Sequence, residues 1–535
     1  MQMYTSPSTS TTHVIPDTGS NSNYGSPYLY NSNLPKSSRL IEQEHHLLED
    51  RTNSLLNTPL PLPVEFYSEA KHVMYAWAKS RALQKKYPGQ PAKCALTIET
   101  LLKRMIEDQR SFPRVELRNQ ISSPVTFRNE ELDTETEIGV NVNMYNALIL
   151  AWAESGIGDA AFERCQQILE SMHDLASSNS GSYNMKPNLN TVRNTLYAAA
   201  SADSYAGLKA EYVLEYVTQQ ELILPNAACW DIVLYAWSKS AKSNPGSAQR
   251  AQEVLDWMIK ESSPKEGYFS LHSTVSTDDT NIVNRKLQPT LQSYRNVVRA
   301  WVKSDDPDAA AKAERVAWQQ YHQFPNLWDI HTWLAVIKAY ARRGNATKAH
   351  EILNACRKHA SNEAEIPNVC YALVLNTYSN SPDRSVETAV AAEDLLTEMM
   401  ELDKKTNGVI RPNTFCFNIV MHAWSRTKSK GAAKRAHRIF NRMQRLHLKQ
   451  MKEEQPELAE MGLLHSAKEE NGVRYPYRPN SISYHILIKA WSWTRGLRAT
   501  LKAEKYLDEM EYIYFSENPE HMKPNVRTYT LGTSC

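Results

Sequence analysis

Five basic residues occupy the same place in a short sequence that recurs along the chain. The stretches AWAKS, AWSKS, AWVKS, AYARR and AWSRT each place a cation three residues after an alanine. These cations are Lys79, Lys239, Lys303, Arg342 and Arg426. If the repeated units stack, equivalent cations form a line of positive charge that attracts an extended polyanion. The alternative is that each cation is only a favourable charge near the C-terminus of its own helix.

Motifs typical of enzymes are missing from the sequence. The 535 residues contain no Walker loop and no GxGxxG, HExxH or GxSxG sequence. The 16 His residues are scattered, and the seven Cys residues include no CxxC pair. We therefore expect no catalytic site, no metal site and no cofactor, and the cysteines favour a reducing compartment over a disulfide scaffold.

The overall composition gives little indication of a partner. The chain has 61 Lys and Arg against 59 Asp and Glu, so its formal net charge is only +2. Any basic surface must therefore be local. No apolar run approaches the length of a membrane span, so we expect no membrane partner.

Each recurring Ala-Trp stretch ends a segment with helical spacing of apolar residues. Examples are NMYNALILAWAES (143–155) and FCFNIVMHAWSRT (415–427), in which an aromatic residue stands six positions before the alanine. A second helical pattern follows, as in AQEVLDWM (251–258) and AEDLLTEM (392–399). Its residues at i, i+3, i+4 and i+7 form one apolar face.

Proline followed by Asn or Thr separates one pair of predicted helices from the next. Proline ends the second helix, and Asn or Thr can start the following first helix as its N-cap. The closest repeats of the alanine position lie 38 and 39 residues apart. A helical hairpin with this period cannot bury its apolar face alone, so stacked copies are expected to form an α-solenoid. Ala and Trp are then packing residues, with Ala at the helix crossing and Trp filling the groove.

These units resemble the pentatricopeptide repeat family. The tetratricopeptide pattern needs a Gly in its first helix that no unit here contains. RPNTFCFNIVMHAWSRT with AHRIFNRM, and NVNMYNALILAWAES with CQQILESM, match the pentatricopeptide pattern closely. The resemblance covers roughly residues 64–531. It implies an all-α fold, a right-handed α-solenoid superhelix of about nine helix-turn-helix repeats.

The resemblance also implies sequence-selective binding of single-stranded RNA, about one base per repeat. In the family, the residue after the first-helix aromatic reads the base together with the residue after the next proline. The pairs in this chain are Asn146 with Asn188, Arg193 with Asn226, Asp231 with Thr290, Arg295 with Asp329, Leu334 with Asn368, Ala372 with Asn413, Asn418 with Asn480, and His485 with Asn525. Asn146/Asn188 and Asn418/Asn480 look like pyrimidine-preferring pairs, while several others do not fit the family's common code.

Two alternatives stay open at this point. The asparagines after proline stand where helix N-caps are expected, so they can be capping residues without a ligand. The whole array can also be a protein-binding α-solenoid scaffold of the tetratricopeptide kind, without RNA activity. An RNA-binding array needs the five cations, whereas a scaffold does not. Other RNA-processing or ribosomal proteins are expected as further partners of an RNA-binding array.

The composition divides the chain into segments. Residues 1–63, rich in Ser, Thr, Asn, Tyr and Pro, are predicted to be disordered. The first part is nearly free of acids, as transit peptides are, but its first arginine is Arg39, so a disordered tail is an equal alternative. Residues 64–531 form the repeat array, with polar insertions near 106–140, 261–287 and 444–477, and 532–535 form an end that looks truncated. By resemblance the expected compartment is the mitochondrion, with plastid or cytoplasm as alternatives, and the expected role is organellar RNA metabolism: stability, processing, splicing or translation.

Overall fold

The computed structural model describes most of the chain as helices. It describes residues 38–79, 92–112, 140–177, 185–262, 287–462, 475–517 and 522–529, apart from positions 203, 326, 361, 363, 364, 495 and 527. Within these ranges the chain forms helices and turns and no β-strand. None of the described helices combines the length and the apolar character needed to cross a bilayer. The chain divides into two compact units, residues 1–60 and 61–535.

The first unit contains α1 (Ser38–Asn57), which departs from the prediction of disorder over residues 1–63. His45, Thr52 and Leu55 are buried, and their spacing of seven and three residues places them on one helical face. The sequence interpretation gave the polar composition too much weight and overlooked this apolar periodicity. The predicted disorder of residues 1–37 lies outside the described residues.

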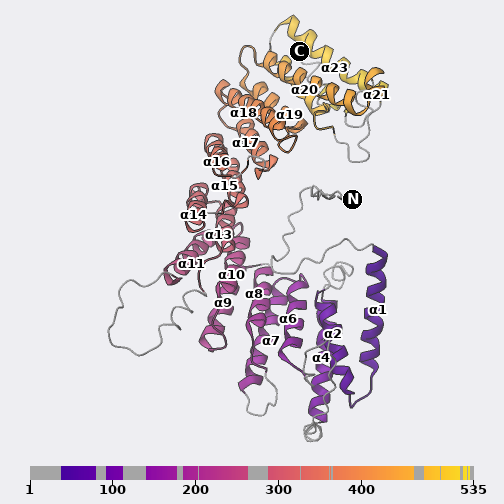
Figure 1. Ribbon diagram of the computed structural model, residues 1–535, viewed down its shortest axis with the longest axis vertical. Coiled ribbons are helices and arrows are strands. Elements are labelled where there is room, and N and C mark those ends of the chain that lie inside the picture. The colour runs from indigo at the N-terminus through magenta and orange to yellow at the C-terminus, as the bar shows by residue number, and fades with distance from the viewer. Residues whose placement is uncertain are drawn as a thin grey trace, which may run out of the picture. The chain divides into compact units, whose positions relative to one another are not determined.

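The second unit consists of antiparallel helix pairs in chain order (Figure 1). The described part contains nine such hairpins. They are α2 (Val64–Lys79) with α4 (Lys93–Ser111), α6 (Val142–Glu154) with α7 (Asp159–Ser177), α8 (Leu189–Ser201) with α9 (Ala206–Gln219), α10 (Ala227–Ser240) with α11 (Ser247–Ser262), α13 (Leu291–Lys303) with α14 (Ala309–Gln323), α15 (Ile330–Arg342) with α16 (Ala346–His359), α17 (Asn368–Asn380) with α18 (Val386–Lys405), α19 (Thr414–Thr427) with α20 (Ala432–Glu454), and α22 (Ser481–Ser492) with α23 (Leu497–Glu517). A short helix, α21 (Pro456–Glu460), follows α20.

Contacts between neighbouring hairpins make a continuous stack. The first helix of each hairpin packs against its own second helix and against the first helix of the next hairpin, as α10 does with α11 and α13. The second helix also packs against the next first helix, as α11 does with α13. The prediction of an all-α array of about nine helix-turn-helix repeats is confirmed.

In five hairpins the residue after the proline caps the helix that it begins, as the sequence predicts, whereas Asn368 lies inside α17 and does not cap it. Asn188, Asn226 and Asn413 are N-caps of α8, α10 and α19, and each side chain accepts a hydrogen bond from a backbone N–H of the first turn. Thr290 and Asn480 form capping boxes with Ser293 and Ser483. Because these caps satisfy otherwise unpaired N–H groups, they stabilise the helix starts.

The recurring tryptophans are buried, and three of them, Trp237, Trp301 and Trp424, bond to the preceding hairpin. The exposed fraction of Trp77, Trp152, Trp237, Trp301, Trp424 and Trp491 is 9% or less. The indole Nε1 of Trp237 donates to Glu211 of the preceding hairpin at 2.9 Å, and Trp424 donates to Glu393 in the same way at 2.8 Å. Glu211 and Glu393 each follow the small alanine of the second-helix pattern. The Trp therefore does more than fill the groove within one hairpin, because it also connects two hairpins.

The recurring alanine is buried except in the first described hairpin. Ala236, Ala300 and Ala339 are fully buried, whereas Ala76 in the first described hairpin is exposed although its neighbour Trp77 is buried. A small residue is needed wherever a preceding first helix approaches closely. The same tight packing occurs at Gly207 of α9, where an added Cβ would lie 2.2 Å from the ring of Trp237.

All three predicted insertions begin later than the sequence indicates, two of them by several residues. Helix α4 continues to Ser111, and α20 continues to Glu454, so both second helices extend into the predicted insertions. The apolar spacing continues in α20, where His447 and Met451 are buried one turn apart. The remaining parts of the three predicted insertions lie largely outside the described residues.

Candidate nucleic-acid interface

One face of each first helix holds the predicted phosphate-binding cations and the first residue of each predicted base-reading pair, while the second residue of most pairs stands at the start of the next hairpin. Three positions in each first helix follow one another at intervals of four residues. They lie five residues before, one residue before and three residues after the recurring alanine position. Four residues turn an α-helix by about 400°, so the three positions share one face. Equivalent positions of successive hairpins form three columns, which we name the first, second and third column in this order.

The first column contains the first residue of each predicted base-reading pair, and the structure brings both members of two asparagine pairs together. The Nδ2 of Asn146 donates to Oδ1 of Asn188 at 3.2 Å, and Thr191 Oγ1 donates to Asn146 Oδ1 at 2.6 Å. The second pair repeats this geometry: Asn418 Nδ2 donates to Asn480 Oδ1 at 3.2 Å, and Ser483 Oγ donates to Asn418 Oδ1 at 2.7 Å. Each first-column asparagine therefore contacts the N-cap of the next hairpin.

Two further predicted pairs also meet across a hairpin boundary. Thr290 Oγ1 donates to Asp231 at 2.7 Å, and Ser293 donates to the other oxygen of this carboxylate. Arg295 donates two hydrogen bonds of 2.7 Å to Asp329, one to each carboxylate oxygen. This pairing lowers the pKa of Asp329 despite its burial and raises that of Arg295. These polar side chains satisfy one another before any ligand is present.

The remaining first-column pairs are less regular. Asn226 and Asn525 accept hydrogen bonds from backbone N–H groups of their own helix starts, while Arg193 and His485 are half-buried. Asn368 lies inside α17 and bonds with the segment before α19, namely with Val409 and Arg411. Leu334 and Ala372 present no polar group. These pairs were predicted from their positions in the repeat alone, and an equivalent position does not guarantee a polar contact.

The third column consists mainly of the five predicted cations, and three of them bond to the preceding hairpin. Lys303 Nζ donates to the carbonyl of Ser238 at 3.0 Å, and Arg342 donates to the carbonyl of Val302 at 2.8 Å. Arg426 donates to the carbonyls of Ser379 and Ser381. The acceptors belong to the last turn of the preceding first helix or follow it directly. Successive third-column residues are therefore direct neighbours. The predicted interaction with a helix C-terminus exists, but the helix is that of the neighbouring hairpin.

The electrostatic environment of the third column is positive. Burial, Arg299 and Lys239 together lower the pKa of Lys303 to about 8. Burial and the charges of Lys489, Arg426 and His485 lower the pKa of His422 to about 4. Every charged group that acts on these two side chains is basic, so His422 is neutral at physiological pH. The approach of an anion to such a surface is therefore energetically favourable.

The second column contains basic residues that sequence reasoning missed. Arg299, Lys338 and Lys489 stand four residues before the third-column position of their helices. Between α10 and α22 neither the second nor the third column contains an acidic residue. The signal was available in the sequence, because a spacing of four places residues on the same helical face. It was overlooked because the position holds Tyr75, Leu150, Tyr197 and Tyr235 in the first four hairpins.

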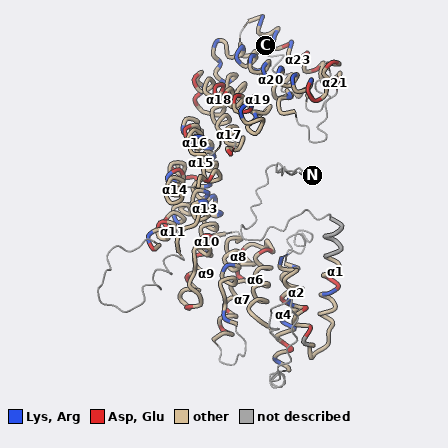
Figure 2. Tube along the Cα trace, viewed as in Figure 1, with Lys and Arg blue, Asp and Glu red and all other residues tan. Residues whose placement is uncertain are grey.

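Acidic residues concentrate on the second helices, where they form ion pairs. Examples are Glu211 with Arg250, Glu393 with Arg435, and Glu398 with Arg357. Figure 2 marks both kinds of charge along the chain, with basic positions on α13 and α15. The total charge is therefore nearly neutral although the charges are segregated. The second helices have an ion-paired surface, and the later first helices have a basic face.

Groups that could support catalysis or bind metal are few in the described residues. Burial raises the pKa of the thiols of Cys94, Cys165, Cys356, Cys370 and Cys416, so these thiols are not activated nucleophiles. On α1, His45, His46 and Glu49 place potential ligand atoms within 4.8 Å of one another. His45 contacts Glu49 at 3.6 Å, an i, i+4 arrangement that the sequence interpretation did not notice.

Comparison with known proteins finds similarity among solved structures alone. No protein-family model matches the chain, and no curated protein matches its sequence. The crystal structure of the pentatricopeptide repeat protein PPR10 from maize matches with 15% identity and a TM-score of 0.42, covering 94% of this chain. PPR10 in complex with an 18-nt psaJ RNA element matches with 13% identity and a TM-score of 0.26, covering 92% of this chain and 68% of that one. The chain described here spans 64% of the length of the first of these.

Proposed function

We propose that the protein binds single-stranded RNA along the first-helix face that holds the three columns. The observation that supports this function is the run of second- and third-column cations from α10 to α22, without an acidic residue among them. Neighbouring cations repel one another: burial is the main cause of the lowered pKa of Lys303, and the charges of Arg299 on the same helix and Lys239 on the preceding hairpin lower it further. A phosphate backbone that follows the columns relieves this repulsion and releases its counterions.

The amide pairs of the first column supply groups for base selection. In each pair the first asparagine is held by the next N-cap and by a hydroxyl, so its orientation is fixed. The Nδ2 atoms of Asn188 and Asn480 have no protein acceptor in the described part of the chain, and both side chains are half-buried. They can donate to an acceptor on a base edge without breaking the existing pair.

The biological setting is also a proposal. The repeat pattern resembles that of the pentatricopeptide family, and residues 1–38 contain a single acid, Asp17. We infer a role on organellar transcripts, with the mitochondrion as compartment, in RNA stability, processing, splicing or translation. A fusion of the chain to a C-terminal fluorescent protein tests the location: fluorescence that does not overlap with a mitochondrial marker contradicts it. Crosslinking in cells followed by sequencing of the attached RNA identifies the transcripts.

Salt dependence of binding tests the proposed function directly. If all five third-column cations contact phosphate, the logarithm of the affinity for a cytidine oligomer should fall with the logarithm of salt concentration at a slope of about −3.5, taking roughly 0.7 per contact. Fluorescence anisotropy over a series of salt concentrations measures this slope. Failure of the folded protein to bind any single-stranded RNA would instead favour a protein-binding scaffold.

A further inference from the structure

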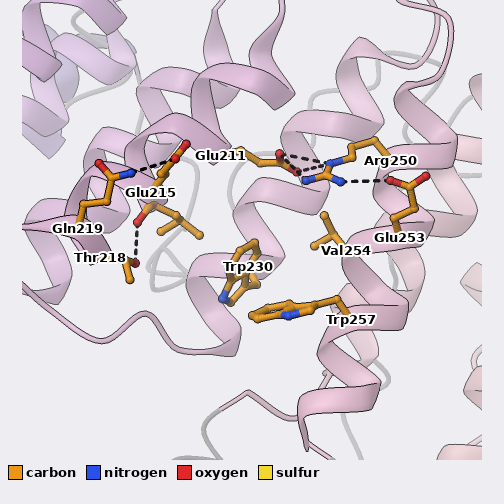
Figure 3. Close-up of a pocket in the computed structure, with 10 residues that line it drawn as sticks. Glu211, Glu215, Thr218, Gln219, Trp230, Arg250, Glu253, Val254 and Trp257 are labelled. Carbon is orange, nitrogen blue, oxygen red and sulfur yellow. Dashed lines mark hydrogen bonds and ion pairs between the residues drawn. The ribbon is translucent and has the colours of Figure 1, made fainter. Parts of the chain in front are cut away.

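A pocket of about 460 Å³ lies among α9, α10 and α11, formed by residues outside the three columns. Figure 3 shows its lining, with Trp230 of α10 and Trp257 of α11 on one side. Glu211 and Glu215 of α9 face Arg250 and Glu253 of α11 across the pocket. Its volume is in the range of pockets that bind a ligand group or a side chain.

Two tryptophan rings supply aromatic surface to this pocket. The centroids of Trp230 and Trp257 lie 4.7 Å apart with an interplanar angle of 51°. Trp257 is 39% exposed, whereas Trp77, Trp152, Trp237, Trp301, Trp424 and Trp491 are buried. An exposed indole does not contribute fully to core packing, and its face attracts cations through the ring quadrupole.

The charges around the rings are mainly negative. The lining contains the carboxylates of Glu211, Glu215 and Glu253 and one guanidinium, that of Arg250. Arg250 is held by Glu211 and by Glu253, each at 3.1 Å, so it neutralises part of this charge. The carboxylate of Glu215 is exposed and accepts a hydrogen bond of 3.0 Å from the neutral side chain of Gln219.

Further carboxylates extend the negative surface beyond the pocket. Glu170 and Asp174 of α7 act on Tyr216 of α9 and, after burial, raise the pKa of its phenol. Tyr212 of the same helix is 47% exposed, and Leu208 one turn earlier is 53% exposed. Acidic groups of α7 and exposed apolar groups of α9 thus lie beyond the pocket.

We propose that this pocket binds a Lys or Arg side chain from a basic segment of a protein partner. The cation would lie against Trp257 and Trp230, with the Glu215 carboxylate as its counter-charge. RNA fits this site poorly, because the carboxylates of Glu211, Glu215 and Glu253 repel phosphate although the indoles could stack on a base. The protein would then bind RNA on the face of its first helices and a basic protein on the surface of its second helices.

Binding of a fluorescent, N-acetylated tetra-arginine peptide to the full chain tests the proposal. Trp257→Leu keeps apolar volume but removes the ring quadrupole, and Glu215→Gln keeps the shape but removes the charge. Each change is expected to weaken peptide binding about 3- to 10-fold at low salt. The affinity for a cytidine oligomer, measured on the same samples, is expected to stay within about twofold.

Matched variants elsewhere serve as controls. Tyr512→Leu removes another exposed aromatic ring from a second helix, α23, and Glu401→Gln removes an exposed carboxylate of α18. Both are expected to bind the peptide like the unaltered protein, and thermal unfolding checks that all four variants are folded. Peptide affinity that is unchanged in both pocket variants overturns the proposal. So does a Trp257→Leu variant that loses affinity for RNA and keeps affinity for the peptide, because the indole then serves as a base-stacking site.

Discussion

The hairpins that begin with α6 and α8 differ from those that begin with α10, α13 and α15 in charge and hardly at all in packing. The earlier two place Leu150 and Tyr197 in the second column and Glu154 and Ser201 in the third. The later three have Lys239, Lys303 and Arg342 in the third column. Both groups bury the recurring alanine, and each contains a first-column residue that bonds across a hairpin boundary.

This contrast separates what stacks the hairpins from what binds a ligand. Lys303 and Arg342 cap carbonyls of the preceding helix, which stabilises the hairpin boundary. The boundary between α6 and α8 forms with Ser201 at the same position, so stacking does not require the cation. Because packing does not require these cations, they support the proposed contact of an anionic ligand mainly with the later hairpins.

The largest expected effect comes from removing the three central cations together. Replacing Lys239, Lys303 and Arg342 with Gln keeps a hydrogen-bond donor for the carbonyls but removes three charges. The slope of the salt dependence should become shallower by about 2.1, and the affinity for a cytidine oligomer should fall about 100-fold at 0.1 M salt, from three contacts of roughly 0.7 each. Anisotropy at several salt concentrations measures both quantities.

The control for this variant removes three exposed cations from a second helix. Lys434, Arg438 and Lys452 of α20, replaced with Gln, change the net charge by the same amount. Binding should stay within about twofold if the columns are the binding face. Equal losses of affinity in the two triple variants would mean that only total charge matters. The difference between the earlier and later hairpins would then not explain RNA binding.

A second prediction compares the two asparagine pairs. Asn418→Ala and Asn146→Ala each remove the closer acceptor of a buried hydroxyl and the hydrogen bond to the next N-cap, so each should lower the free energy of unfolding by about 1–2 kcal/mol. Because cations flank Asn418 and not Asn146, we expect only Asn418→Ala to cost a further 1–3 kcal/mol of binding to the preferred base. Chemical denaturation and binding to oligomers that differ at one base measure the two effects. Equal losses of base preference would extend the RNA path to α6.

Lys303 provides a pH-dependent prediction. Its native pKa of about 8 lies below the usual value of 10.5, so the unfolded chain holds more protons between these two values. The stability of the fold should therefore rise as the pH increases through this window. RNA binding needs the charged form, so affinity for a cytidine oligomer should fall about 5- to 10-fold between about pH 7 and 9. Lys303→Arg should abolish most of that fall, because guanidinium stays charged. An identical pH profile in this variant would exclude Lys303 as the titrating group.

The smallest expected effect comes from adding a cation to the earlier region. Ser201 is exposed at the end of α8, in the third column. Ser201→Lys should increase affinity about fivefold at 0.1 M salt and make the slope steeper by about 0.7, provided that the RNA reaches this hairpin. Ser177→Lys, at the exposed end of α7 on the second-helix surface, is the control and should change neither. No gain from Ser201→Lys would place the end of the RNA path between α8 and α10.

The sequence predicted most of the fold because the information for it is local and repeated. The helical spacing of apolar residues, the prolines and the N-cap asparagines each occur within a dozen residues, and nine approximate copies reinforce one another. The prediction departed from the structure at α1 and at the end of α20, where apolar spacing continues inside a polar segment. Composition outweighed periodicity there, although periodicity determines which residues can be buried.

The candidate site was predictable by position and not by contact. The column positions follow from a spacing of four residues, so the sequence alone determined that Asn146 and Asn418, and Lys239 and Lys303, occupy equivalent places. Only the tertiary structure decided that Asn418 bonds Asn480, that Lys303 bonds the carbonyl of Ser238, and that Trp237 reaches Glu211 of the preceding hairpin. Helix periodicity is a property of adjacent residues. These contacts join residues 26 to 65 positions apart, and they depend on how closely one hairpin packs against the next.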